Sequence, residues 1–186
     1  MNSHFLAVVG PSGSGKSSLV KAGVLPALRR GALTGSSDWY IAEFVPGSDP
    51  IGNLANALDS IATRHLPDLI QRLQASTGSL LPVLDELLGD QAGDVLFVID
   101  QFEEVFTQTS NEAERTHFLE LFRSAVRQPG GRLRVVVTLR ADFYDRPLHY
   151  EGFGSLVKKN TEVVLPLSLQ ELERAIQGPL ERAGLA

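Results

Sequence analysis

The segment from Gly10 to Ser17 reads GPSGSGKS and fits the pattern G-x-x-x-x-G-K-[ST] at every fixed position. Its glycines permit backbone angles that turn amide groups inward around a phosphate. Lys16 is the mobile charge for the β- and γ-phosphates, and the Ser17 hydroxyl is a ligand for Mg²⁺. An apolar run precedes the segment and a helical pattern follows it, which disfavours a plain glycine turn. The predicted nucleotide-binding residues are Gly10, Pro11, Ser12, Gly13, Ser14, Gly15, Lys16, Ser17 and Ser18.

A second group of chemical side chains lies in VLFVIDQFEEVF, residues 95–106. Asp100 ends an apolar strand downstream of the phosphate loop, where P-loop enzymes carry the acid that orients the Mg²⁺ shell, the Walker B position. The alternative roles for this carboxylate are a helix N-cap or a surface turn. We therefore predict a metal site made by Ser17 and Asp100.

The residues after Asp100 leave the choice of catalytic acid open. Gln101 stands where many P-loop ATPases with an extra strand between the two motifs carry a water-polarising glutamate. An amide can orient water but cannot take a proton. Glu103 and Glu104 follow three and four positions after Asp100, and a helical turn would swing both toward the metal and the γ-phosphate. Alternatively, one of them complements the dipole of a helix start.

A charged residue also ends a later strand, in VVVTLRADFYDR. Arg140 at the carboxyl end of that strand can lie near the γ-phosphate, report its presence and stabilise charge that develops during its transfer. The alternative is an internal ion pair with Asp142, Asp145 or one of the glutamates.

Five strands and the helices between them must position these groups. The apolar, β-branched runs predict strands at 5–9, 39–45, 94–100, 132–139 and 162–167. Helical patterns follow the phosphate loop and span 51–64, 66–74, 80–89 and 112–126, and Gly23 and Pro26 are expected to break or kink the first of them. Ser168 and Glu171 form an S-x-x-E capping box before a last helix. Alternating strands and helices predict a three-layer α/β sandwich with about five parallel strands, whose ligands bind at the carboxyl ends of the strands.

Composition limits the protein class. The chain has 186 residues with 43% hydrophobic content, enough for one domain, and a net charge of −5, which provides no overall field for nucleic acid or anionic membranes. The absence of cysteine excludes disulfides and thiolate metal sites and fits a reducing cytosol. The histidines lack ligand spacing, and no apolar run approaches the ~18 residues of a membrane span. We expect a soluble, cytoplasmic domain.

Taken in order, GPSGSGKSSLVKAGVLPAL, VLFVIDQFEEVF and VVVTLRADFYDR closely resemble the novel STAND-type NTPases, signal-transduction ATPases with numerous domains. PGSDP and VVLPLSLQELERAIQGPLERAG extend the resemblance over nearly the whole chain. The DQFEE and TLRADFYD segments are more specific than the phosphate loop alone. The predicted fold is a P-loop NTPase sandwich with strand order 2-3-4-1-5.

The resemblance implies a nucleotide-operated switch that binds ATP and Mg²⁺ and hydrolyses ATP slowly. Such modules usually lie in large bacterial proteins between an effector domain and sensor repeats, and ATP supports an active, often oligomeric form. A related motif, of NACHT type, has an acid pair at the same distance from its first aspartate. By that analogy Glu104 is the catalytic acid, Glu103 supports Mg²⁺ or water, and Arg140 matches the sensor position.

Two departures from the family pattern concern the ends of the chain. The chain begins at the first strand, without the upstream glycine-arginine-glutamate segment that helps hold the base in such ATPases. It stops where the helical lid is expected, so we interpret residues 1–186 as a single P-loop core with a truncated lid that begins near residue 168.

Other nucleotide-dependent functions were weighed against an ATPase. A GTPase is disfavoured because no N-K-x-D motif follows the phosphate loop and Asp100 does not begin D-x-x-G. An ABC-type motor is disfavoured because L-S-G-G-Q is missing. A small-molecule kinase shares the phosphate loop and stays open, although no acceptor site or mobile lid is evident. The main alternative is a non-hydrolysing scaffold that binds nucleotide to hold a conformation for protein partners.

Overall fold

The sheet has the predicted strands in the predicted order. The computed structural model describes residues 4–89, 93–168, 170–171, 173 and 177–178. Its parallel strands are β1 (Phe5–Gly10), β2 (Tyr40–Phe44), β3 (Val95–Ile99), β4 (Leu133–Arg140) and β5 (Thr161–Val163). They lie in the order β2-β3-β4-β1-β5, which confirms the expected topology. Because the strands are parallel and β3, β4 and β1 are neighbours, their carboxyl ends lie side by side at one end of the sheet.

The fifth strand is shorter than the sequence predicts. It ends at Val163, not at residue 167, although the Val164 amide still donates to the carbonyl of Val9 at 2.7 Å. Pro166 has no amide hydrogen to offer a neighbouring strand, which limits how far the ladder can run.

Helices connect the strands. The first helical segment comprises α1 (Lys16–Ser18), the π-helical η1 (Leu19–Val24) and α2 (Leu25–Arg29). The others are α3 (Pro50–Ile61), α4 (Leu69–Ala75), α5 (Leu80–Leu88), α6 (Glu104–Thr107), α7 (Glu112–Arg127) and α8 (Phe153–Lys159). Short 3₁₀ turns η2 (Ser36–Asp38), η3 (Ala141–Phe143) and η4 (Arg146–His149) complete the described elements. The sequence did not predict α8.

Of the predicted break or kink at Gly23 and Pro26, the break is wrong. The backbone stays helical from Lys16 to Arg29, and it widens to π-type hydrogen bonding over Leu19–Val24. Pro26 falls in the first turn of α2, after the widened segment, where a missing amide hydrogen is tolerated more easily than in a regular helix interior. Gly23 thus lies within the widened stretch and Pro26 just after it, and neither residue ends the helix.

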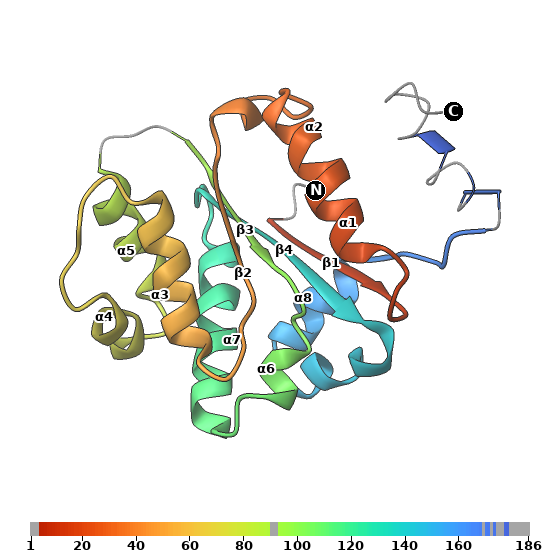
Figure 1. The fold of residues 1–186 in the computed structure, drawn as a ribbon. Coiled ribbons are helices and arrows are strands. Elements are labelled where there is room, and N and C mark those ends of the chain that lie inside the picture. The colour runs from red at the N-terminus through yellow and green to blue at the C-terminus, as the bar shows by residue number, and fades with distance from the viewer. Residues whose placement is uncertain (1–3, 90–92, 169, 172, 174–176, 179–186) are drawn as a thin grey trace.

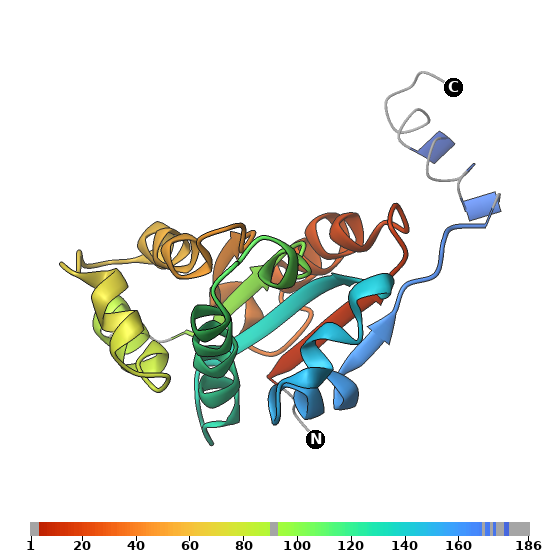
Figure 2. The same cartoon turned by 90° about the horizontal axis from the view of Figure 1, so that it is seen from below.

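The sheet separates two helical layers, as predicted (Figures 1 and 2). One layer is the α1–η1–α2 segment, and α7 and α8 pack on the opposite face; α3, α4 and α5 lie beside the β2 edge. Side chains alternate between the faces, as a pleated strand requires. The cluster under the first layer comprises Val8, Val20, Leu25, Leu28, Leu96, Val98 and Val136.

This alternation fixes the direction of the polar groups at the ends of the strands. Val98 and Val136 both pack toward the α1–η1–α2 layer. Asp100, directly after β3, and Thr138, on β4, each follow these valines by two positions and therefore point toward that layer. The pleat thus directs both polar side chains at the helix that follows the phosphate loop.

The predicted capping box is present at the C-terminal side. Ser168 Oγ donates to Glu171 Oε2 at 2.8 Å, and the Glu171 amide donates back to Ser168 Oγ at 3.3 Å. Most of the expected lid after this point lies outside the described residues. Within the part of the chain that the structure describes, no helix combines the length and the apolar character needed to cross a membrane.

Candidate nucleotide-binding site

The phosphate loop forms an open hollow at the carboxyl edge of the sheet. Gly13 (φ 75°) and Gly15 (φ 85°) adopt left-handed backbone conformations that side chains disfavour, so the motif's glycines are required by geometry. The hollow measures about 290 Å³ and is lined by Gly13, Gly15, Lys16, Ser17 and Ser18. All nine residues predicted to bind nucleotide thus lie in or directly beside one loop, from Gly10 to Ser18.

Close contacts define the base of the loop. A Cβ atom added to Gly10 would lie 2.2 Å from the carbonyl oxygen of Val164 and 2.7 Å from Ser14 Oγ, so only glycine fits there. Lys16 is 8% exposed, and its Nζ donates to the carbonyls of Gly10 and Pro11 at 2.8 Å each. Backbone carbonyls of the phosphate loop therefore hold the Lys16 ammonium group beside the place where a phosphate would bind.

Asp100 is the centre of the polar cluster beside the loop. It is 5% exposed, and its Oδ1 accepts from Ser17 Oγ at 2.7 Å and from Thr138 Oγ1 at 2.6 Å. Its Oδ2 pairs with Lys21 Nζ at 2.8 Å. The Gln101 amide donates to Asp100 Oδ1 at 3.1 Å and to Thr138 Oγ1 at 3.0 Å. Side chains from two separate segments, the first helical segment and β4, thus meet one carboxylate.

These contacts set the charge of Asp100. Burial works to raise its pKa, but hydrogen bonds from Lys21, Thr138 and Ser17 outweigh burial and hold the pKa below the ordinary value of 3.8. The carboxyl group is therefore ionised at neutral pH and presents a negative charge next to the Ser17 hydroxyl.

The donor set fits Mg²⁺ bound together with nucleotide. Mg²⁺ usually keeps several waters and takes one or two protein carboxylates plus substrate phosphates. Ser17 Oγ and Asp100 Oδ1 supply one hydroxyl oxygen and one carboxylate oxygen, 2.7 Å apart. Among the described residues no group of three or more His, Cys, Asp or Glu side chains could hold a metal ion by itself.

A sharp turn follows Asp100 and directs the two glutamates. Gln101 has φ 52°, a left-handed conformation unusual for a residue with a side chain. Phe102 then enters the core at 1% exposure, and the chain turns into α6 at Glu103 and Glu104. Glu103 Oε2 accepts from the Arg140 amide at 3.2 Å, which brings this carboxylate to the end of β4. For the Glu104 carboxylate, the described residues provide no hydrogen bond or ion pair.

Arg140 lies beside the start of the phosphate loop. It pairs in register with Gly10 across the β1–β4 ladder. Its guanidinium is exposed, forms an ion pair with Asp142 at 2.6 Å and lies over the ring of Phe143. The hydrogen bond with Asp142 raises the pKa of Arg140, so the group stays charged. The ion pair with Asp142, the alternative that the sequence offered, is present. The sensor role of Arg140 stays a prediction, based on its place beside Gly10.

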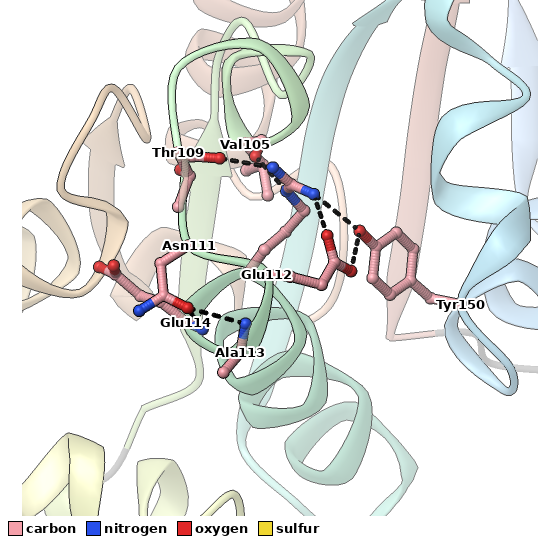
Figure 3. Close-up of polar contacts among 8 residues, drawn as sticks. Val105, Thr109, Asn111, Glu112, Ala113, Glu114 and Tyr150 are labelled. Atoms are coloured by element: carbon pink, nitrogen blue, oxygen red, sulfur yellow. Dashed lines mark hydrogen bonds and ion pairs between the residues drawn. The ribbon is translucent and has the colours of Figure 1, made fainter.

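Sequence reasoning missed a network that holds α6. Arg115 Nε donates to the carbonyl of Val105 at 2.9 Å, and its terminal nitrogens contact the Thr109 carbonyl and the Glu112 carboxylate (Figure 3). Tyr150 Oη donates to Glu112 Oε1 at 2.8 Å and accepts from Arg115 at 3.3 Å. Arg115 therefore links the end of α6 to the segment after β4. Only a contact between distant parts of the chain reveals this role.

The start of α7 places Arg115 for these contacts. Asn111 caps the helix, and its side-chain oxygen accepts from the amides of Ala113 at 2.9 Å and Glu114 at 3.4 Å (Figure 3). Such a cap fixes where the helix begins. Arg115 then lies in the first turn, next to the loop that leaves α6.

Comparisons with known proteins agree with this geometry. A family model described as Novel STAND NTPase 1 matches residues 1–186. The fold is similar to the ORC2 protein of Aeropyrum pernix in its ADPNP–ADP complexes, with 17% identity and a TM-score of 0.65 over 96% of this chain. The ADP form of that protein gives 16% identity and a TM-score of 0.62 over 95% of this chain. In both cases the match covers 46% of the other chain, so this chain spans about half of that protein. No curated protein sequence matches this chain significantly.

Proposed function

Because the chain belongs to the Novel STAND NTPase 1 family, we propose that it is an ATP-binding molecular switch that hydrolyses ATP slowly with Mg²⁺. The observation that carries this proposal is the convergence of Ser17 and Thr138 on the buried carboxylate of Asp100, directly beside the phosphate loop. A loop that only turned between a strand and a helix would not require an ionised carboxylate at this position. The family resemblance supports ATP as the nucleotide.

Each predicted residue has a role that its position supports. Lys16 would leave the carbonyls of Gly10 and Pro11 and bind the β- and γ-phosphates, since phosphate oxygens are stronger acceptors for an ammonium group than neutral carbonyls. Ser17 and Asp100 would hold Mg²⁺, which supplies charge neutralisation at the phosphates when bound.

The catalytic acid is assigned to Glu104, with Glu103 as the supporting residue. The Glu103 carboxylate already accepts a hydrogen bond from the Arg140 amide, so it is suited to holding the backbone at the end of β4 in place. Glu104 is half-buried, and its carboxylate has no hydrogen bond or ion pair among the described residues, so it is free to orient and polarise a water. Arg140 would exchange Asp142 for the γ-phosphate and so report its presence.

The test measures two quantities, phosphate release with Mg²⁺-ATP and ATP affinity, in the wild type and in Lys16→Ala, Glu104→Gln and Glu103→Gln. Lys16→Ala should weaken ATP binding by about 100-fold or more, because charged hydrogen bonds to the phosphates are lost. Glu104→Gln should keep ATP affinity and lose phosphate release by roughly 100-fold or more, since an amide cannot accept a proton. Glu103→Gln should lose less, because an amide oxygen can still accept from the Arg140 amide.

Equal phosphate release from wild type, Lys16→Ala and Glu104→Gln would exclude hydrolysis at this site. A greater loss in Glu103→Gln than in Glu104→Gln would exchange the two roles. The matched control is Glu162→Gln, an exposed glutamate on β5, which should change neither quantity.

The alternative function is a scaffold that binds nucleotide without hydrolysis. Gln101 at the position next to Asp100 favours it, because that position carries an amide in place of an acid. Tight ATP binding with no turnover, in the full-length protein as well as in this chain, would establish the scaffold. Under either function we propose that the chain acts within a larger cytoplasmic signalling protein of a bacterium, on effector and sensor domains, with nucleotide-dependent self-association. Sedimentation of the full-length protein with and without ATP tests the last point.

A further inference from the structure

Lys21 forms an ion pair with Asp100, the carboxylate that would help to hold Mg²⁺. Its Nζ is 2.8 Å from Asp100 Oδ2, while Ser17 and Thr138 both donate to Oδ1. The carboxylate therefore has a donor at each oxygen, and its charge is already balanced by a cation from its own chain. An ion pair of this kind at a buried carboxylate removes the unpaired charge that would otherwise destabilise the fold.

We propose that Lys21 is an internal counter-ion that balances the charge of Asp100 and makes Mg²⁺ binding conditional on nucleotide. The inference rests on the proposed function for the identity of the metal–nucleotide ligand. Mg²⁺ alone gains too few protein oxygens here to displace the ammonium group, whereas Mg²⁺ carried by triphosphate brings its own ligands. Lys21 thereby separates the empty state of the switch from the loaded one.

The helix geometry supports this role. Lys21 follows Ser17 by four positions, so both side chains project from the same side of the first helical segment toward Asp100. Lys21 belongs to the π-helical stretch η1, and such stretches often mark functional positions. The same short segment thus offers a metal ligand and the cation that competes with the metal.

The structure also offers a second position for the displaced ammonium group. The Lys21 side chain is 45% exposed, so it can move without breaking the core. Glu43 on β2 pairs in register with Val98, which packs toward the α1–η1–α2 layer, and neighbouring residues of a parallel ladder point the same way. Glu43 is exposed and close enough to interact with Lys21 electrostatically. We therefore expect Lys21 to exchange Asp100 for Glu43 when the metal–nucleotide binds.

The test measures Mn²⁺ binding without nucleotide, by electron paramagnetic resonance, in wild type, Lys21→Met and Lys21→Arg. Lys21→Met should bind Mn²⁺ about tenfold more tightly than wild type, because Asp100 is then unpaired. Lys21→Arg keeps the cation and should behave as wild type. Mg²⁺ without nucleotide should raise the melting temperature of Lys21→Met and leave that of wild type unchanged. Lys158→Met, at an exposed lysine of α8, is the matched control.

Two further variants locate the effect. In Lys21→Met with Asp100→Asn, the gain in Mn²⁺ affinity should vanish, and a gain that persists would overturn the proposal. Glu43→Gln removes the second position and should weaken Mg²⁺-dependent ATP binding by roughly threefold while Mn²⁺ binding without nucleotide stays low.

The outcomes separate this inference from the proposed function. Equal Mn²⁺ affinity in wild type and Lys21→Met, with Mg²⁺-ATP bound by both, would overturn the counter-ion role and leave the switch intact. Failure of wild type to bind Mg²⁺-ATP would overturn the proposed function, whatever the Mn²⁺ result. Circular dichroism shows whether each variant is folded. Where Lys21→Met is unfolded, a Lys21→Arg variant that bound Mn²⁺ more tightly than wild type would still overturn the counter-ion role.

Discussion

At Asp100, three side chains from two segments meet one carboxylate, whereas the Glu104 carboxylate has no hydrogen bond or ion pair within the described part of the chain. Asp100 is 5% exposed, and Ser17, Lys21 and Thr138 fix both of its oxygens. Glu104 is half-buried and is placed only through the backbone of α6. Two acids of one short stretch are thus held in different ways.

The difference separates a prearranged binding group from a group that can still adjust. Polar contacts at Asp100 set its position before any ligand binds, which lowers the cost of ordering it on binding. The position of Glu104 depends on α6, a helix of four residues, too short to be stable by itself. Packing and the Arg115 contacts must therefore hold α6.

The largest effect should come from Phe102, which lies between Asp100 and Glu104, the two ends of the stretch from residue 100 to residue 104. It is 1% exposed and stacks on Phe153, with ring centroids 5.8 Å apart. Phe102→Ala should lower the free energy of unfolding by about 3–5 kcal/mol, because a large aromatic group leaves a cavity in the core. Urea denaturation measures this loss.

Phe102→Leu, which retains most of the volume, is the control and should lose less. If Phe102→Ala were as stable as wild type, Phe102 would not anchor the turn between Asp100 and α6. A variant that keeps ATP binding at low temperature but loses phosphate release would show that the anchor serves Glu104 more than Asp100.

Arg115→Ala should have the next largest effect and should act on the Glu104 end alone. It leaves the carbonyls of Val105 and Thr109 without their donor and should cost about 1–3 kcal/mol of stability. Phosphate release should fall roughly 10- to 100-fold through misplacement of α6, while ATP affinity stays within about twofold of wild type.

Two variants control for this substitution. Arg115→Lys can restore one contact and should recover part of the turnover, which a loss of helix stability alone would not explain. Arg127→Ala, at the exposed end of α7, should leave turnover unchanged. If Arg115→Ala weakened ATP binding and turnover equally, the two ends of the stretch would not be supported separately.

Thr138→Val acts on the Asp100 end and should cost about 1–2 kcal/mol at pH 7, because a buried carboxylate loses a donor. The pKa of Asp100 is lowered in the folded protein, so its contacts contribute stability above the unfolded value near 3.8. That contribution is lost as the pH falls through the folded pKa. The cost of Thr138→Val should therefore be full at pH 7 and shrink below about pH 3.8, which urea denaturation at several pH values measures.

Thr138→Ser retains the hydroxyl and isolates the effect of the methyl group, so its cost should be small and independent of pH. A cost of Thr138→Val that stays constant down to acidic pH would mean that the hydrogen bond to Asp100 does not lower the pKa of the carboxyl group.

The same comparison explains what the sequence could predict. The phosphate loop and the strand that ends at Asp100 are local patterns, and the pleat directs Asp100 and Thr138 to one layer, so strand order and the Asp100 site follow from short-range rules. No such rule predicts the partners of Lys21 and Arg115. Their contacts join residues 79 and 10 positions apart, to Asp100 and Val105, and both depend on how helices pack.

The misses have the same origin. The helix continues through Gly23 and Pro26, and packing against the sheet supports it, because Val20 within the widened stretch and Leu25 directly after it are buried. The shorter β5 reflects Pro166, whose effect on a strand depends on which neighbour it would bond. Local propensity describes the chain well where the partner is a few residues away and poorly where the partner is distant.

The smallest effect should come from Tyr150, at the far end of the Arg115 network. Tyr150→Phe removes the hydroxyl that donates to Glu112 at 2.8 Å and keeps the ring that packs against Phe106. Because both hydroxyl partners are partly exposed or charged and can turn to water, the loss should be about 0.5–1.5 kcal/mol. Arg115 keeps its contacts with α6, so phosphate release should fall less than threefold. If Tyr150→Phe lost as much turnover as Arg115→Ala, the segment after β4 would be what positions α6. Arg115 would then act mainly by linking Tyr150 to α6, and less through its own bond to α6.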